Sequence, residues 1–447
     1  MESKNVKRPG GSAEPTWSPR LSLPAIHQRS LGQPRQPRRL LGHGKVCRSI
    51  LTGVLELDSA LEFDAARTEE DFFPALPAAP AVCLIEPREE RAEPFLIRTQ
   101  NLQRRLERLL GPADPASKRL NLRGFASGIR YRLTGSRFEQ TLTFYQQARQ
   151  RFPKRYRNLM RLRPPTVLKV NLPNAYPRCY VTRKILLDAD GRPAGGSYYG
   201  PFPSRRAAEA FAERILDFFK VRRCQIKIRR DPTFPGCIYS EMKMCLAPCF
   251  SGCTKEEYDV EVNRLVEFLE TSGGSLRIAF EQERERASEQ LDFERARTMH
   301  KRVERLDEVL RGRPEITRRI QDLRAVILQR AAEEQTIGVF AVDGGRLAEP
   351  SFVRFGEIAS QPRSAEQIFR DYLESAPHVA NGDLAEDVSL VSRWFYSKPR
   401  EGEIFFREKD WPYRRILRAC SRLLARAEGE PAKSPAPRPR PSPEGAS

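Results

Sequence analysis

The sequence has no long hydrophobic run and few histidines. None of its apolar stretches approaches the roughly 20 residues that a membrane-spanning helix needs, so no membrane span and no membrane partner are expected. The first residues, MESKNVKRPGGS, carry basic side chains without an apolar segment behind them, which excludes a typical secretory signal and predicts a cytoplasmic location. The four histidines, His27, His43, His300 and His378, are scattered and no two have the spacing of metal ligands. They are interpreted as surface residues.

Acidic residues are in deficit. The 447 residues include 78 Lys and Arg against 58 Asp and Glu, which gives a net charge of +20. A polyanion is therefore the first partner class to consider, because neutralising phosphates releases counterions and provides affinity that does not depend on base sequence. Nucleic acid leads, and an anionic membrane surface is second. The length allows roughly three domains of about 150 residues each.

Both ends of the chain lack the periodicity of helices and strands. Residues 1–48 are rich in Pro, Gly, Ser and Arg and are expected to form a disordered basic arm. Residues 429–447 have a similar composition and are expected to form a disordered tail. The arm could contact phosphates or only increase solubility, and its composition favours the second interpretation.

Between these ends, the hydrophobic pattern predicts an α+β protein of several domains. Residues 70–203 are expected to form a small α/β domain, and residues 204–254 a helix followed by a cysteine-rich segment. Residues 255–332 are dense in Glu, Arg and Leu at helical spacing, which predicts two or three helices that pair as a hairpin. Residues 333–428 are expected to form a small C-terminal α+β domain.

Individual elements follow from their periods. Strands are predicted for AVCLIE, PFLI, TVLKVNL, RCYVTRKILLD and for a pair formed by TIGVFAVDGGRL and SFVRFGEI. Helices are predicted for RTQNLQRRLERLLG, RFEQTLTFYQQARQRF, SRRAAEAFAERILDFFKV, EQIFRDYLESA and WPYRRILRACSRLLARA. Gly111 is expected to end the first of these helices and Ser204 to cap the third. Asp343 and Asp387 are interpreted as turn and capping residues, since Asp before Gly-Gly favours a hairpin turn.

Five of the nine cysteines lie between Cys224 and Cys253. In a reducing compartment, clustered thiols indicate a metal more than disulfides. Four of them could be drawn onto one site by a loop: Cys224, Cys237, Cys245 and Cys249. Thiolates suit zinc or an iron-sulfur cluster, and the gaps of 12, 7 and 3 residues do not decide between the two. Five reduced thiols without a metal are the alternative.

Around these cysteines the chain resembles the UvrC family of the excinuclease ABC system. SYYGPFPSRRAAEAFAERILDFFKVRRC is similar to the family's YFGPY segment and the helix that ends in FPLRTC, and PGCIYSEMKMCLAPC is similar to its PCLxYxIxxCxAPC run. Cys224, Cys237, Cys245 and Cys249 match the four family cysteines, which are understood to hold an iron-sulfur cluster. The resemblance implies the same cofactor here, with zinc as the alternative. Cys253 has no counterpart.

The segment ASEQLDFERARTMHKRVERL, within residues 276–310, resembles the family's UVR motif. This motif is a helical hairpin with the pattern ALxFExAxxxRDxI that pairs with the corresponding motif of the damage-verifying helicase subunit. The resemblance implies that a UvrB-like helicase subunit binds at the matching residues, which include Leu291, Phe293, Glu294 and Ala296. Where the family has Arg-Asp, this chain has His300 and Lys301, which reverses a charge at a contact position. An ordinary helix pair with solvated charges is the alternative.

Upstream, the chain resembles the family's GIY-YIG nuclease domain but differs at catalytic positions. That chemistry needs a tyrosine or activated water as base, an arginine that stabilises the phosphoryl transition state, and a carboxylate that holds one divalent metal. Arg105 matches the catalytic arginine, whereas the two family tyrosines fall on Cys83 and Phe95. The metal-binding glutamate falls on Phe144, or on Tyr145 if the register slips by one.

Phenylalanine cannot coordinate magnesium, which requires oxygen ligands. The resemblance therefore implies a GIY-YIG-like fold with a degenerate, inactive centre, in which Arg98, Arg104 and Arg105 contact phosphates. Magnesium or manganese would be a cofactor only if the nuclease were active, for example through Glu139 as an alternative ligand. The family's second, ribonuclease-H-like nuclease and its helix-hairpin-helix repeats are not recognisable in the roughly 120 residues after the UVR-like segment.

Three hypotheses follow. The favoured one is a shortened UvrC-like protein of nucleotide excision repair that binds DNA and the helicase subunit without incising. The second is a divergent structure-specific endonuclease that uses Arg105 and Glu139. The third is a non-enzymatic DNA-binding regulator whose cluster reports oxidation.

Overall fold

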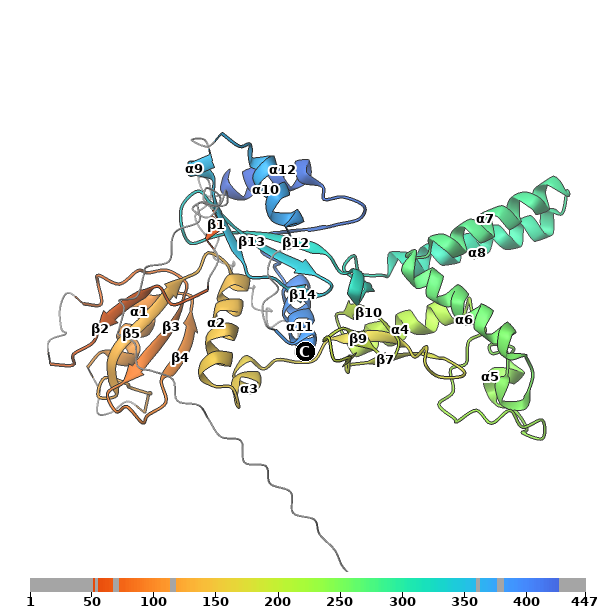
Figure 1. Cartoon of the computed structure of the whole chain (residues 1–447), viewed down its shortest axis with the longest axis horizontal. Coiled ribbons are helices and arrows are strands. Elements are labelled where there is room, and N and C mark those ends of the chain that lie inside the picture. The colour runs from red at the N-terminus through yellow and green to blue at the C-terminus, as the bar shows by residue number, and fades with distance from the viewer. Residues whose placement is uncertain are drawn as a thin grey trace, which may run out of the picture. The chain divides into compact units, whose positions relative to one another are not determined.

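The computed structural model describes residues 51–52, 55–66, 72–112, 118–358, 362–375 and 382–425. The predicted disordered arm and tail, together with His27, His43 and His378, lie outside the described residues. Over the described ranges the fold is mixed α+β, as predicted, with twelve α-helices and four sheets (Figure 1). Within the same ranges, no helix combines the length and the apolar character needed to cross a membrane.

The first sheet has the strand order β2-β5-β3-β4 and is antiparallel throughout. Its strands are β2 (Ser59–Glu62), β3 (Ala81–Pro87), β4 (Phe95–Thr99) and β5 (Ala126–Leu133). Helix α1 (Leu102–Leu110) covers one face, where Cys83 packs against Leu102 and Leu106. Helix α2 (Arg137–Arg151) covers the other face, where Val82 packs against Phe138. The alternation of β3 residues thus separates two cores.

Gly111 ends α1 as predicted. Its backbone N–H donates to the Glu107 carbonyl at 2.8 Å, and a Cβ at this position would lie 2.5 Å from the same oxygen. Any side chain would therefore push this helix end apart. The predicted strands β3 and β4 and the helices α1 and α2 are confirmed, whereas β2 and β5 are not among the predicted elements.

The second sheet has the order β11-β10-β6-β7, so residues 70–203 contribute to two separate sheets. Its strands are β6 (Thr166–Val170), β7 (Cys179–Thr182), β10 (Ser197–Phe202) and β11 (Arg318–Arg319). The predicted strand RCYVTRKILLD is instead two short strands, β7 and β8 (Leu186–Leu187), and the second pairs with β9 (Pro193–Ala194). Helix α4 (Arg205–Leu216) packs on this sheet, and the Ser204 hydroxyl caps it by accepting from the Ala207 N–H at 3.1 Å, as predicted.

The cysteine-rich segment and three long helices follow. The segment contains α5 (Ile238–Glu241) and the 3-10 helix η1 (Pro248–Phe250), and the long helices are α6 (Lys255–Glu270), α7 (Gly274–Glu289) and α8 (Phe293–Arg311). Helices α7 and α8 form the predicted hairpin (Figure 1). Arg277 near the start of α7 pairs with Asp307 near the end of α8, which fits their antiparallel arrangement.

The C-terminal sheet has the order β1-β15-β13-β12-β16, with β14 beside β13, and all of its described pairings are antiparallel. Its strands are β1 (Leu51–Thr52), β12 (Ala325–Arg330), β13 (Thr336–Asp343), β14 (Arg346–Leu347), β15 (Ser351–Arg354) and β16 (Glu403–Phe406). The remaining elements are η2 (Ile320–Asp322), α9 (Phe355–Ile358), α10 (Ala365–Glu374), α11 (Leu384–Phe395) and α12 (Tyr413–Ala425). The predicted strand pair and the helices α10 and α12 are confirmed.

The two faces of the C-terminal sheet have different coverings. Helices α10 and α12 pack on one face, where Phe369 and Ile416 meet Val326. The other face packs on α11 and on α2, where the Phe340 ring lies 5.2 Å from that of Phe138. Helix α2 therefore has a place in two layers, against the first sheet and against the C-terminal sheet (Figure 1).

One predicted role in this region is wrong. Asp383, not Asp387, caps α11, and its carboxylate accepts from the Ala385 N–H at 2.8 Å. Asp387 lies inside the helix, where it is buried and accepts from the Leu347 N–H at 3.3 Å. Burial raises its pKa to about 7. Asp343 does precede a turn, in which Gly344 and Gly345 have positive φ values of 56° and 80°.

Candidate functional site

Cys83 and Phe95, which stand at the family's tyrosine positions, lie in the first sheet. The Cys83 side chain faces α1, has no exposed surface, and has Ile97 as its cross-strand partner. Burial raises the pKa of its thiol to about 12, so the group remains protonated near neutral pH. Phe95 is half-buried at the edge strand β4. Neither side chain provides a base for phosphodiester chemistry.

Phe144, at the position that the resemblance assigns to the metal-binding glutamate, belongs to the core around α2. It is only 7% exposed, and the Arg98 guanidinium lies 5.6 Å from its ring centroid. The Tyr145 hydroxyl is also engaged in a structural contact, since it donates to Glu386 Oε2 at 2.6 Å. Either register of the resemblance therefore places an aromatic ring where a divalent metal would need a carboxylate.

Arg104 and Arg105 lie on α1, which covers the opposite face of the sheet from α2. Arg104 is exposed, and its backbone N–H bonds to the Asn101 cap at 2.9 Å. Arg105 is half-buried. Of the predicted phosphate contacts, only Arg98 is on the same side of the sheet as Phe144.

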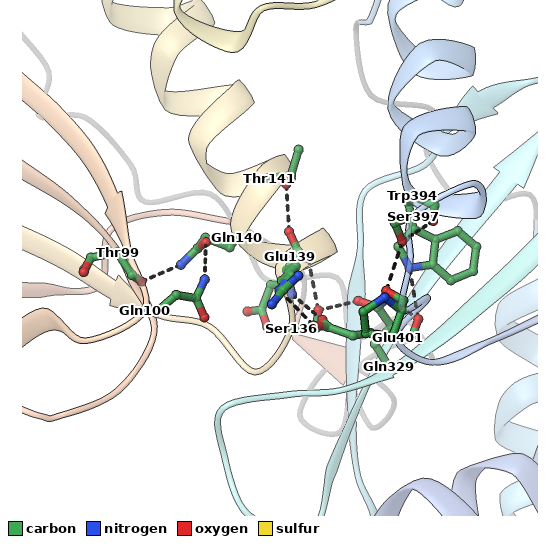
Figure 2. A network of polar contacts seen from close by, with 12 residues as sticks. Thr99, Gln100, Ser136, Glu139, Gln140, Thr141, Gln329, Trp394, Ser397 and Glu401 are labelled. Atoms are coloured by element: carbon green, nitrogen blue, oxygen red, sulfur yellow. Dashed lines mark hydrogen bonds and ion pairs between the residues drawn. The ribbon is translucent and has the colours of Figure 1, made fainter. Parts of the chain in front are cut away.

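Glu139, the alternative ligand, is held inside a network at the start of α2 (Figure 2). It is 2% exposed, accepts from the Gly135 N–H at 2.9 Å, and lies 3.5 Å from Arg132 Nε. Ser136 caps the helix and also bonds to Gln329 of β12. The carboxylate thus faces its own helix start rather than solvent.

The same network ties α2 to the C-terminal domain. Gln329 Nε2 and Trp394 Nε1 each donate to the Glu401 carbonyl at 3.0 Å (Figure 2). On the other side, Gln140 Nε2 donates to the Thr99 carbonyl at 2.7 Å. Desolvation of Glu139 raises its pKa to about 7 despite its bond to Gly135 and the nearby Arg132. Partial protonation and burial make this carboxyl a structural group, and a poor ligand for a hard cation.

Four of the cysteines that match the family motif lie close to one another. Cys237 precedes α5, Cys249 lies in η1, and the Cys245 sulfur accepts from the Ala247 N–H at 3.3 Å. Burial raises the pKa of Cys245 to about 11, and the neighbouring thiols of Cys224, Cys237 and Cys249 raise it further. Within the described ranges, no group of three or more Cys, His, Asp or Glu side chains is arranged so that it could hold a metal ion. The bound cofactor stays a prediction.

Arg222 is a residue at this site that the sequence analysis missed. It is 4% exposed and donates to the carbonyls of Tyr176 at 2.8 Å, Cys224 at 3.2 Å and Ile226 at 3.0 Å. These bonds fix the path of the chain through Cys224. In the sequence, only its position two residues before Cys224 points to this role.

The residues that match the UVR motif surround the turn of the α7–α8 hairpin. Leu291 has a left-handed φ of 58° and is 72% exposed, and Phe293 is 69% exposed. Asp292 between them caps α8 by accepting from the Arg295 N–H at 3.0 Å. Glu294 is exposed and Ala296 is half-buried. The hairpin therefore presents two large apolar side chains to solvent at its tip.

Comparisons with known proteins show that the chain is similar to UvrC proteins. Residues 166–268 match the profile of the UvrC/Cho excinuclease middle domain. The chain is 25% identical over 350 residues to the UvrABC system protein C of Carboxydothermus hydrogenoformans, a match that covers 74% of this chain and 55% of the relative. The protein of the same name from Trichlorobacter lovleyi is 27% identical over 281 residues, covering 62% and 44%. That from Desulfitobacterium hafniense is 35% identical over 135 residues, covering 30% and 20%.

The chain spans about half the length of the curated relatives it matches. No solved structure matches it significantly.

The buried Glu139 predicts a pH-dependent stability. Folding raises its pKa from 4.5 to about 7, so the folded chain keeps a proton that the unfolded chain has lost. This stabilisation is complete below pH 4.5 and is lost as the pH rises through about 7. Relative to Glu139→Gln, which cannot ionise, the native chain should lose up to about 3 kcal/mol of unfolding free energy over this range.

Urea denaturation at a series of pH values measures this difference. Glu285→Gln, at an exposed position in α7, is the matched control and should follow the native chain. A difference between the native and Glu139→Gln chains that stays constant with pH would contradict the assignment.

Proposed function

We propose that this UvrC-like chain is a DNA-binding subunit of nucleotide excision repair whose GIY-YIG-like centre does not cut DNA. The matches to the middle domain and to UvrABC system protein C support a role related to the incision subunit. The absence of incision is inferred mainly from Phe144, a buried ring under the Arg98 guanidinium at the position of the metal ligand. The buried Cys83 and Glu139 support the same inference.

DNA binding is supported by charge. The chain carries a net charge of +20, and Arg98 and Arg104 are both exposed on the GIY-YIG-like part. Exposed guanidinium groups form bidentate contacts with phosphate oxygens. The arginines would therefore position the duplex without reading its sequence.

The α7–α8 hairpin is the proposed contact with a UvrB-like helicase subunit. Exposed Leu291 and Phe293 beside exposed Glu294 provide an apolar anchor with a charged rim, the usual composition of an interface centre. His300 forms a pair with Glu304 within α8, at 3.6 Å, at the position where the motif differs from its relatives.

An iron-sulfur cluster held by Cys224, Cys237, Cys245 and Cys249 is the proposed cofactor. Four thiol donors within one folded loop have the chemistry of such a site. Burial raises the pKa of Cys245 and Cys249 and so disfavours their thiolates, and the iron would supply the compensating positive charge. Binding would cross-link the segment between α4 and α6, so cofactor binding and folding would be coupled.

Incision of damaged DNA tests the proposed inactivity of the centre. A lesion-bearing duplex incubated with the native chain and the family's damage-recognition subunits, in magnesium or manganese, should be bound but not nicked. Arg105→Ala should not change this result. Nicking by the native chain that is lost in Arg105→Ala or in Glu139→Gln would identify an active endonuclease and contradict the proposal.

Binding of the helicase subunit tests the proposed role of the hairpin tip. Phe293→Ala should weaken its binding at least tenfold, because truncating an aromatic anchor typically costs about 2 kcal/mol or more. The exposed position of Phe293 means that the fold should not be destabilised. Ile278→Ala, which removes a side chain that is 56% exposed on α7 away from the tip, is the matched control for titration calorimetry. Equal affinities for both variants would exclude the tip as the contact.

The metal content of the purified chain tests the proposed cofactor. Chain purified without oxygen should be brown and contain iron and sulfide, and Cys249→Ala should lose both together with part of its stability. Cys420→Ala, which changes a fully buried cysteine of α12, should keep its iron. A colourless protein with stoichiometric zinc would refute the iron-sulfur assignment.

A further inference from the structure

Arg98 and Arg163, from separate parts of the chain, both lie near Arg393. Arg98 comes from β4 and lies over the Phe144 ring, and Arg163 follows α3 (Tyr156–Met160). Arg393 comes from α11, and its two terminal nitrogens donate to the carbonyls of Met160 at 3.1 Å and Arg161 at 3.3 Å. These bonds hold α11 against the segment that carries Arg163.

A second bond fixes the same junction. The Ser389 hydroxyl, one turn before Arg393 on α11, donates to the Arg163 carbonyl. The backbone around Arg163 is therefore anchored twice to α11, while its side chain is exposed. The fold thus fixes the Arg393 side chain and the backbone of Arg163 at one junction.

The three arginines differ from many others in the described part of the chain, which pair with carboxylates. No described carboxylate forms an ion pair with Arg98, Arg163 or Arg393. The pKa of Arg393 is lowered, mainly by burial and further by the positive charges of Arg98 and Arg163. Unpaired like charges held near one another repel, and a bound anion would relieve this repulsion.

The positive surface continues past Arg163. A cavity of about 560 Å³ is lined by Arg163 together with Arg183 and Lys184, both exposed. The two carboxylates in its wall are already engaged by Arg157, which lies 3.6 Å from Asp383 and 2.6 Å from Glu386. The cations on this side are therefore available to an extended polyanion.

We propose that Arg98, Arg163 and Arg393 bind a backbone phosphate of DNA directly, where the family's nuclease centre would hold a divalent metal. The inference depends on the proposed function and specifies its DNA-binding surface. A carboxylate centre needs a metal ion to attract the scissile phosphate, whereas guanidinium groups attract it without one. With Phe144 beneath the Arg98 guanidinium in place of a metal ligand, the site binds phosphate without cleaving the phosphodiester bond.

The test is the affinity of the full chain for a fluorescein-labelled DNA duplex, measured by anisotropy at several salt concentrations in EDTA and in magnesium. The native chain should bind equally well in EDTA. Arg98→Gln and Arg163→Gln should each weaken binding about tenfold and reduce the slope of log affinity against log salt by about one. Arg393→Gln should do the same, but it also removes two structural bonds, so Arg98 and Arg163 carry the test.

Arg418→Gln, at an exposed position on α12, is the control for the loss of one positive charge and should bind like the native chain. Arg98→Gln and Arg163→Gln variants that bind as tightly as this control would overturn the inference and leave the repair role intact. Binding that disappears in EDTA would also overturn it, since a metal would then be required. A native chain that binds no DNA would overturn both, and tighter binding to an RNA duplex would overturn the assignment to DNA.

Discussion

The double burial of α2 is the constraint on which the rest of the structure depends. One side of this helix packs on the first sheet through Val82, and the other packs on the C-terminal sheet through Phe340 and on α11 through Trp394. A helix enclosed on two sides keeps only a narrow exposed edge, which includes Arg137 and Gln150. Its side chains must be apolar or fully hydrogen-bonded, because an unpaired buried polar group costs several kcal/mol.

This constraint accounts for the residues that occupy α2. Phe138, Leu142 and Phe144 fill the core, while Ser136, Glu139 and Gln140 have hydrogen-bond partners at the helix start. Ser136 bonds to Gln329, which is 193 residues away in sequence, and Gln329 bonds in turn to Glu401. Position 144 therefore lies in a packed core, where a carboxylate would need a buried partner and Phe144 needs none.

The sequence predicts well what depends on local pattern. The periods of AVCLIE and of the leucines in α1 identify their elements, and Gly111 and Ser204 fix the ends of helices. It predicts poorly what depends on distant partners. Strand β12 (AVILQR) is an apolar run without alternation, as expected of a strand buried on both faces, and such a run does not reveal its neighbours.

The candidate site divides in the same way. Phe144 and the four cysteines are found by their motifs, since these positions are defined by neighbours along the chain. Arg163 and Arg393 are not, because their meaning comes only from the contact between α11 and the segment after α3. Asp387 fails for a related reason: Asp383 provides a competing cap four residues earlier, and only the tertiary structure buries the second aspartate.

Electrostatics connects these observations. An active metal centre balances its cation with carboxylates, so removing the carboxylate without further change would leave a phosphate site with neither attraction nor balance. In the proposed function, the missing carboxylate is accompanied by guanidinium groups from β4 and α11, and the second of these elements belongs to the sheet domain that encloses α2. Under the proposed function, the packing that encloses Phe144 also brings the Arg393 cation near Arg98. Affinity for phosphate would then be retained by a different chemical means, while the polarisation that breaks the bond would be lost.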